Sequence, residues 1–259
     1  MIITPLGTVS PYCKKRKKCP GFMINEGQTK LLLDCGNGIS SQLKFPDDLQ
    51  NLTIVISHLH KDHYGDLSCL AYASFVYRNL GNLHNKIKVY IPNDKNSYDF
   101  AFLKNYAKES FLEFLVYNSN DIIKVDDLVI SFKRNPHPIL TNSIKVTNSY
   151  KTIVYSSDTG FLNNTLIEFS ANCDLLICES SFLKEQSKNN PNHLCAEEAA
   201  SIAKEAKVQK LVLTHFWPEI KPKEYINEAK KIFKNTFAAK ENKKIIIKNS
   251  YTFCKSFSF

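Results

Sequence analysis

Residues 57–66, SHLHKDHYGD, place three histidines and two aspartates within ten positions. Imidazole nitrogens and carboxylate oxygens are protein ligands that zinc, manganese and iron all accept. Four side chains of this stretch are therefore candidate metal ligands: His58, His60, Asp62 and His63. The alternative interpretation is a polar turn without a metal, and other residues of the chain have to decide between the two.

The spacing of these candidates favours two metal ions over one. If the chain leaves the preceding strand still extended, His58 and His60 point to the same side and can share an ion. Asp62 and His63 follow after the chain begins to turn, so they are aimed differently. Four ligands from six consecutive residues would strain one tetrahedron, whereas two neighbouring ions could each take two ligands here. The obvious remote suppliers are His137, Asp158 and His215, with the Asp158 carboxylate as the natural bridge between the ions.

Seven short runs rich in valine, isoleucine and leucine predict the strands that would position these side chains: residues 29–35, 52–58, 86–91, 128–133, 151–158, 173–180 and 210–215. Polar residues end or follow several of the runs, namely Asp34, His137, Asp158, Glu179 and His215. In α/β proteins, such residues line the functional site, because loops at the carboxyl ends of strands converge there. One histidine, or one aspartate near a glycine, is ordinary in a turn. The prediction rests on the number of such residues, since six of the seven histidines lie at strand exits or loop starts.

Helical patterns separate several of these strands. Residues 195–207 repeat alanine every three or four positions, and residues 222–235 begin with a proline and carry an apolar stripe. Strands interspersed with helices indicate a layered α/β architecture. The composition shows no break that would mark a boundary, so residues 1–259 are expected to form a single domain.

The composition is that of a soluble globular protein, with 43% hydrophobic and 23% charged residues. We find no signal-peptide pattern and no apolar run of eighteen residues, and therefore expect a cytoplasmic protein without a membrane span. The eight cysteines form no C-x-x-C pair and are expected to be reduced. The net charge of +9 includes the run KKRKK at residues 14–18. This run is typical of a solvated loop, and the alternative is attraction for a polyanion or a phosphorylated small molecule.

The motif H-x-H-x-D-H, preceded by a strand and followed by glycine, resembles the signature of the metallo-β-lactamase fold. The match is HLHKDH, with Asp34, His137, Asp158 and His215 in the order of that family. The resemblance implies a four-layer αββα sandwich and two divalent ions, zinc first and manganese as the alternative. It implies one ion on His58, His60 and His137, and another on Asp62, His63 and His215. It further implies that Asp158 bridges the ions, that Asp34 supports the ligands, and that a shared water becomes a hydroxide nucleophile for hydrolysis.

The later stretch NHLCAEEAASIAKEAKVQKLVLTH resembles the phosphodiesterase branch of that family, which includes ribonuclease Z. In that branch a histidine opens a helix before the last ligand, a place that His193 holds here, and Glu179 matches the carboxylate that orients it. The resemblance thus implies catalytic roles for Asp62, His193 and Glu179, with His193 donating a proton to the leaving oxygen or hydrogen-bonding the phosphate. The alternative for His193 is a polar residue at a helix start.

Only twenty residues, 138–157, separate His137 from Asp158, and they read as a hairpin with no room for the tRNA-gripping arm of bacterial ribonuclease Z. The sequence is similar in length and motifs to the anti-Pycsar cyclic-nucleotide phosphodiesterases, which are compact homodimers. We therefore predict hydrolysis of a small phosphodiester, a 3′,5′-cyclic nucleotide, by a homodimer. Three aromatic residues beside the motifs are candidates to stack on the base, or else belong to the core: Phe182, Phe216 and Trp217. The alternatives are an RNA 3′-end processing ribonuclease, a lactone or thioester hydrolase, and a nucleic-acid-binding protein that is not an enzyme.

Overall fold

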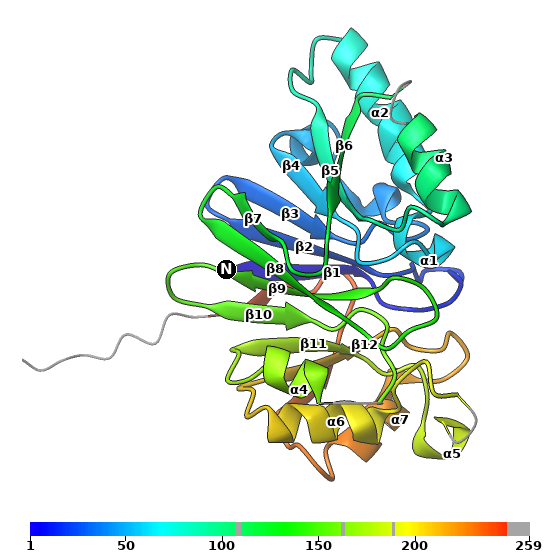
Figure 1. Cartoon of the computed structure of the whole chain (residues 1–259), viewed down its shortest axis with the longest axis vertical. Coiled ribbons are helices and arrows are strands. Elements are labelled where there is room, and N and C mark those ends of the chain that lie inside the picture. The colour runs from blue at the N-terminus through cyan, green and yellow to red at the C-terminus, as the bar shows by residue number, and fades with distance from the viewer. Residues whose placement is uncertain (107–109, 162–163, 188–189, 248–259) are drawn as a thin grey trace, which may run out of the picture.

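The computed structural model describes residues 1–106, 110–161, 164–187 and 190–247 (Figure 1). Two seven-stranded sheets lie face to face, and helices cover their outer faces. The first sheet has the order β14-β1-β2-β3-β4-β5-β6, with β1 Ile2–Gly7, β2 Gly21–Glu26, β3 Thr29–Leu33, β4 Leu52–Val55, β5 Ile87–Pro92, β6 Leu112–Tyr117 and β14 Ile245–Ile246. The second has the order β13-β12-β11-β10-β9-β8-β7, with β7 Ile122–Val125, β8 Leu128–Arg134, β9 Asn142–Thr147, β10 Thr152–Tyr155, β11 Leu175–Glu179, β12 Leu211–Thr214 and β13 Thr236–Ala238.

The helices lie in two groups, one on each side of the paired sheets. On the side of the first sheet are α1 Lys61–Tyr64, α2 Leu67–Asn79 and α3 Tyr98–Tyr106. On the side of the second sheet are α4 Thr165–Phe169, α5 Lys184–Ser187, α6 Ala196–Glu205 and α7 Pro222–Ala229. Across the described residues, no helix is long and apolar enough to cross a membrane.

Three layers of buried side chains hold the sandwich together, because successive residues of a strand point to opposite faces. In β3, Leu31 and Leu33 pack between the sheets, while Leu32 packs toward α2. In β12, Val212 packs between the sheets, while Leu211 packs toward α6. Strands buried on both faces read as unbroken apolar runs, which is why the sequence revealed them. The predicted four-layer αββα architecture is confirmed.

All seven predicted strands form, and the two predicted helices correspond to α6 and α7. The prediction for residues 222–235 was too long, because α7 ends at Ala229 and the chain turns to place β13 beside β12. Strand β7 escaped the prediction, since its residues alternate between exposed and half-buried and form no dense apolar run. Strand β9 lay within the stretch interpreted as a hairpin, and its antiparallel pairing with β10 confirms that hairpin.

The parallel strands decide where the site lies. Strands β3 and β4 are parallel neighbours in the first sheet, and β10, β11 and β12 are parallel neighbours in the second. Their carboxyl ends meet at one edge of the sandwich, and the polar residues that follow them are brought together there.

Candidate metal centre

Two groups of side chains at this edge are arranged as metal ligands would be, and a third, Asp158 with His193 and His215, overlaps them. The first consists of His58, His60, His137 and Asp158, and the second of Asp62, His63 and His215. Within each group, one nitrogen or carboxylate oxygen from every residue lies within 4.8 Å of the others. Every metal ligand expected from the sequence is therefore present in one of the two groups.

The Asp158 carboxylate lies between the two groups. One oxygen, Oδ1, is 3.0 Å from Nε2 of His215 and 3.2 Å from Nε2 of His63. The other oxygen, Oδ2, is 3.5 Å from Nε2 of His58 and 3.9 Å from Nε2 of His137. Each oxygen thus faces one group, which is the arrangement of a carboxylate that can serve two cations.

The distances between the facing ring nitrogens match those expected of two ligands on one metal ion. Nε2 of His58 and Nδ1 of His60 are 3.1 Å apart, and Nε2 of His63 and Nε2 of His215 are 3.3 Å apart. Two nitrogens on one tetrahedral zinc, at bonds of about 2.0 Å, would be separated by roughly 3.3 Å. Asp158 Oδ1 is buried, and within the described residues it has no hydrogen-bond donor in suitable geometry. The residues present therefore fit divalent cations.

Other residues fix the outward nitrogens of these rings, so that the inward nitrogens stay available. Nδ1 of His63 lies 2.7 Å from Oδ2 of Asp34, and Nδ1 of His215 lies 2.8 Å from Oγ of Ser181. Nδ1 of His137 lies 3.1 Å from a backbone carbonyl oxygen, that of Asn192. A ring nitrogen that donates outward fixes the tautomer and leaves the opposite nitrogen as the ligand.

Asp34, which the resemblance placed behind the ligands, contacts His63 and further partners around it. It accepts hydrogen bonds from the backbone N–H and the hydroxyl of Ser57, at 2.7 and 2.9 Å, and from the Tyr155 hydroxyl at 2.8 Å. Asp34, Ser157 and His215 all have positive φ, at 59°, 53° and 61°. Such conformations are uncommon outside glycine and cluster at functional sites, and here they turn the chain as it leaves three strands.

The pKa values of the three histidines in the first group suit metal binding, because a ligand imidazole has to be neutral. Burial lowers the pKa of His137 to about 4, although the charge of Asp158 opposes the shift. Burial, together with the neighbouring His58, lowers the pKa of His60 to about 4. Burial also lowers the pKa of His58. These three rings are therefore neutral at physiological pH without help from a metal.

The second group carries an excess of negative charge. Burial opposes charging of both Asp158 and His63, yet the histidines hold the pKa of Asp158 well below its usual value. The carboxylates of Asp158, Asp62 and Asp34 hold the pKa of His63 well above its usual value. Burying three carboxylates around one ring costs free energy unless cations compensate their charge. This excess is a second physical argument for divalent cations at this position.

His193 and Glu179 form a pair beside the metal ligands. Nδ1 of His193 is 3.0 Å from Oε1 of Glu179 and 3.9 Å from Oδ2 of Asp158. Burial opposes protonation, but the charge and hydrogen bond of Glu179 prevail and raise the pKa of His193 to about 9. Glu179 also accepts hydrogen bonds from the backbone N–H of Thr159 and the hydroxyl of Ser181. Glu179 thus holds His193 by its Nδ1 and favours the protonated form of the ring.

Of the three aromatic candidates, Phe182 contacts His193 and Trp217 stacks on Phe182. The ring centroids of Phe182 and His193 are 6.2 Å apart, and the Phe182 and Trp217 rings stack with centroids 6.4 Å apart. Phe216 differs, because it is 1% exposed and packs against Tyr225 in the core. Its burial leaves no ring face for a substrate, so the suggested base contact does not suit Phe216.

Sequence reasoning missed several serines that position the site. The Ser10 hydroxyl donates to Oδ2 of Asp62 at 2.5 Å, and Ser181 joins Glu179 to His215. Serine is too common at loops to stand out, and Ser10 lies 52 residues before its partner. The run at residues 14–18 lies close to the same edge, since Lys14 contacts Glu219 and Lys17 donates to the carbonyl oxygen of Pro218 at 3.2 Å.

Comparisons with known proteins agree with this geometry. A family model described as "Anti-Pycsar protein Apyc1" matches residues 1–243. The probable metallo-hydrolase YhfI of Bacillus subtilis (strain 168) is 27% identical over 216 residues, which cover 83% of this chain and 86% of the relative. A ribonuclease Z of Clostridium kluyveri is 28% identical over 269 residues, covering 82% of this chain and 87% of the relative. The crystal structure of YhfI, titled a metallo-beta-lactamase fold protein, superposes with a TM-score of 0.87 at 26% identity and covers 94% of this chain and 98% of that one.

Proposed function

The chain has the metallo-β-lactamase fold, belongs to the anti-Pycsar protein Apyc1 family and is a metal-dependent hydrolase, and we propose that its substrate is a 3′,5′-cyclic nucleotide. The observation that carries this proposal is the placement of His193, on Glu179, next to the paired ligand groups. That placement supplies a proton donor beside a cation site, which is what cleavage of a phosphodiester with a poor leaving group needs.

We propose that two divalent ions, zinc or manganese, occupy the centre. One would be held by His58, His60 and His137, the other by Asp62, His63 and His215, with Asp158 between them. When bound, two such ions supply an activated water at neutral pH and stabilise the charge that develops on the phosphoryl oxygens.

The side chains of the protein would then perform the remaining tasks. Hydrolysis adds water across one phosphorus–oxygen bond of the ring, so the departing ribose oxygen needs a proton. His193 is protonated below its raised pKa, and its Nε2 is the atom that would deliver that proton. Phe182 and Trp217, which stack on each other beside His193, would form the wall on which the base lies.

The compact hairpin favours a small substrate over a tRNA precursor. Thr147 pairs directly with Thr152, so only four residues connect β9 to β10 at the position where bacterial ribonuclease Z would carry its arm. This connection is too short to form an arm that grips a folded RNA, which supports the proposal of a small substrate.

We further propose that the protein is a homodimer that uses the outer face of α2 and α3. Large apolar side chains are exposed there, including Tyr72 at 71%, Tyr98 at 81% and Phe102 at 45%. A cluster of exposed aromatic residues on neighbouring helices is typical of a protein–protein contact. Light scattering of the purified protein measures the mass, and a dimer that becomes monomeric in Tyr72→Ser with Phe102→Ser would support this surface.

A metal analysis combined with a substrate panel tests the proposed function. The panel contains cyclic mononucleotides, cyclic dinucleotides, a tRNA precursor, a lactone and a thioester, each with added Mn²⁺ or Zn²⁺. We expect turnover of a cyclic mononucleotide and about two metal ions per chain. We expect His60→Ala to abolish the turnover and to lower the metal content. The control is His84→Ala, which removes an exposed histidine outside the site. Turnover of the acyl esters alone, or of the tRNA precursor alone, would contradict the proposal.

A further inference from the structure

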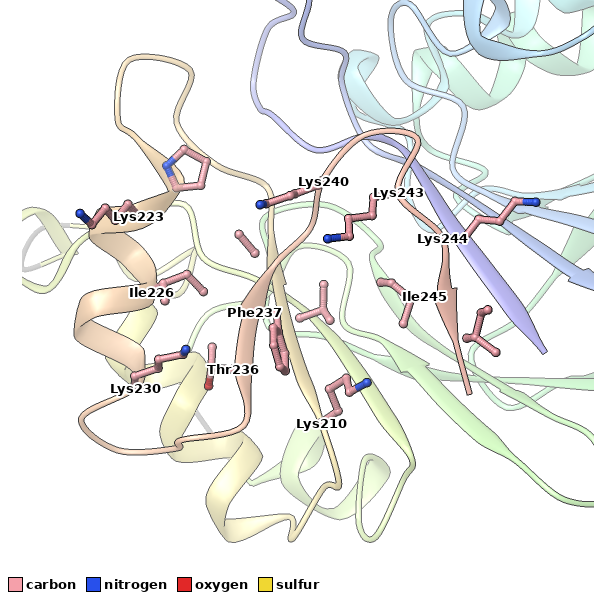
Figure 2. A pocket seen from close by; sticks show the side chains of 14 residues that line it. Lys210, Lys223, Ile226, Lys230, Thr236, Phe237, Lys240, Lys243, Lys244 and Ile245 are labelled. Atoms are coloured by element: carbon pink, nitrogen blue, oxygen red, sulfur yellow. The ribbon is translucent and has the colours of Figure 1, made fainter. Parts of the chain in front are cut away.

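A second cavity lies at the opposite, open side of the sandwich, and it is rich in lysine. Its volume is about 550 Å³, and it is bounded by α7, by the edge strands β13 and β14, and by the start of β12 (Figure 2). Six lysines contribute to its lining: Lys210, Lys223, Lys230, Lys240, Lys243 and Lys244. The lining includes no aspartate or glutamate.

Phe237 lies at the centre of this cavity, with positive charge around it. The ammonium groups of Lys210 and Lys230 are each 5.7 Å from the centroid of its ring. Lys240 and Lys243 extend over the same space from the segment that joins the two sheets, whereas Lys244 points away (Figure 2). The Phe237 ring is 48% exposed, although it belongs to a strand, so it offers a free apolar surface.

Charge balance within the protein does not account for these lysines. Within the described part of the chain, none of the six forms an ion pair, whereas Lys151 nearby is paired with Asp174 at 2.8 Å. A smaller adjoining cavity shares Lys210 with this one but includes that balanced pair. These six lysines without an ion pair all line the larger cavity, and only Lys210 also lines the smaller one.

Protection of the sheet edges does not account for them either. Lysines on edge strands prevent pairing with other chains, but they do so from the strands themselves. Here β13 is Thr236–Ala238 and β14 is Ile245–Ile246, and neither contains a lysine. The lining lysines come instead from a helix, from a connecting segment and from the residue before β12.

We propose that this cavity is a binding site for a nucleoside di- or triphosphate, separate from the metal centre. Phosphate groups would lie among the lysines, and the base would lie on the apolar floor formed by Phe237 and Ile226. A volume of about 550 Å³ suits one small ligand, and α7 bounds the cavity on one side, which favours a free nucleotide over an extended nucleic acid. Lys210 lies at the opposite end of β12 from His215, roughly 16 Å away along an extended strand.

The inference does not depend on the proposed function, and binding alone tests it. The probe is a non-hydrolysable analogue of adenosine triphosphate, titrated calorimetrically into the full-length, metal-loaded protein. We expect Lys240→Glu with Lys243→Glu to weaken binding at least tenfold, and binding to weaken further with added salt. The matched control is Lys124→Glu with Lys133→Glu, which makes the same charge change at exposed positions on β7 and β8 and should alter the Kd less than twofold.

Two further measurements separate this site from its alternatives. Phe237→Ala should weaken binding of the nucleotide several-fold and leave binding of inorganic triphosphate unchanged, because only the base contacts the ring. Asp158→Asn should leave nucleotide binding unchanged, since that residue belongs to the metal centre. Equal binding by the two lysine double variants would overturn the proposal, as would loss of binding in Asp158→Asn. An affinity that rises with the length of single-stranded RNA would overturn it in favour of an extended nucleic-acid surface.

Discussion

Removal of the His193 imidazole should slow cleavage according to how badly the leaving oxygen needs a proton. General-acid catalysis contributes roughly 100- to 10,000-fold to a rate. A ribose alkoxide is a poor leaving group, so we expect His193→Ala to lower kcat for a cyclic nucleotide by about that factor. A p-nitrophenyl ester of the same nucleotide releases a resonance-stabilised phenolate, and its kcat should fall by less than about tenfold.

Replacement of Glu179 by glutamine provides a pH test of the same idea. Nδ1 of His193 donates to Oε1 of Glu179 at 3.0 Å, and glutamine keeps an acceptor there but removes the charge. A charged hydrogen bond contributes about 1.5–3 kcal/mol and a neutral one about 0.5–1.5 kcal/mol, so the loss is about 1–1.5 kcal/mol. Since one pKa unit corresponds to about 1.4 kcal/mol, the pKa of His193 should fall by about one unit.

The sign of the pH effect follows from the raised pKa. A proton donor is active while protonated, so the wild-type rate should hold below the pKa of His193, about 9, and decline as pH rises through it. In Glu179→Gln the decline should begin about one pH unit lower. Steady-state rates from pH 6 to 10 on both substrates measure this. Equal losses on both substrates in His193→Ala, or an unmoved alkaline limb in Glu179→Gln, would refute proton donation and indicate phosphate binding instead.

Three further predictions concern the same edge of the sandwich. Chelation of both metals should lower Tm by about 10–20 °C, because each cation at a hundred times its Kd contributes about 2.7 kcal/mol, and calorimetry with and without a chelator measures this. Asp158→Asn should release metal and lower kcat more than a hundredfold while the fold persists, as elemental analysis and circular dichroism would show; retention of two ions would contradict its bridging place. Trp217→Ala should raise KM for a cyclic nucleotide about 5- to 100-fold with kcat nearly unchanged, since stacking on one base contributes about 1–3 kcal/mol; an unchanged KM would place the base elsewhere.

The sequence by itself determined the layered architecture and the candidate ligands. The central strands are buried on both faces, so they appear as unbroken apolar runs, and the polar residues that end them stand out against those runs. Strand ends also explain why His58, Asp158 and His215 could be named before any contact was known. Each follows within three residues of the end of a strand, so the local sequence was enough to place it there.

Only the tertiary structure decided which of these residues meet and what surrounds them. Ser10 reaches Asp62 across 52 positions, and Ser181 reaches His215 across 34, and no local pattern encodes such contacts. Phe216 and Trp217 are neighbours in sequence, yet alternation along the chain buries the first against Tyr225 and leaves the second stacked on Phe182. The lysine-rich cavity likewise exists because the edges of two sheets, β13 and β14, come together with α7. Packing of distant segments creates these environments, and distances across the folded chain cannot be read from spacing along it.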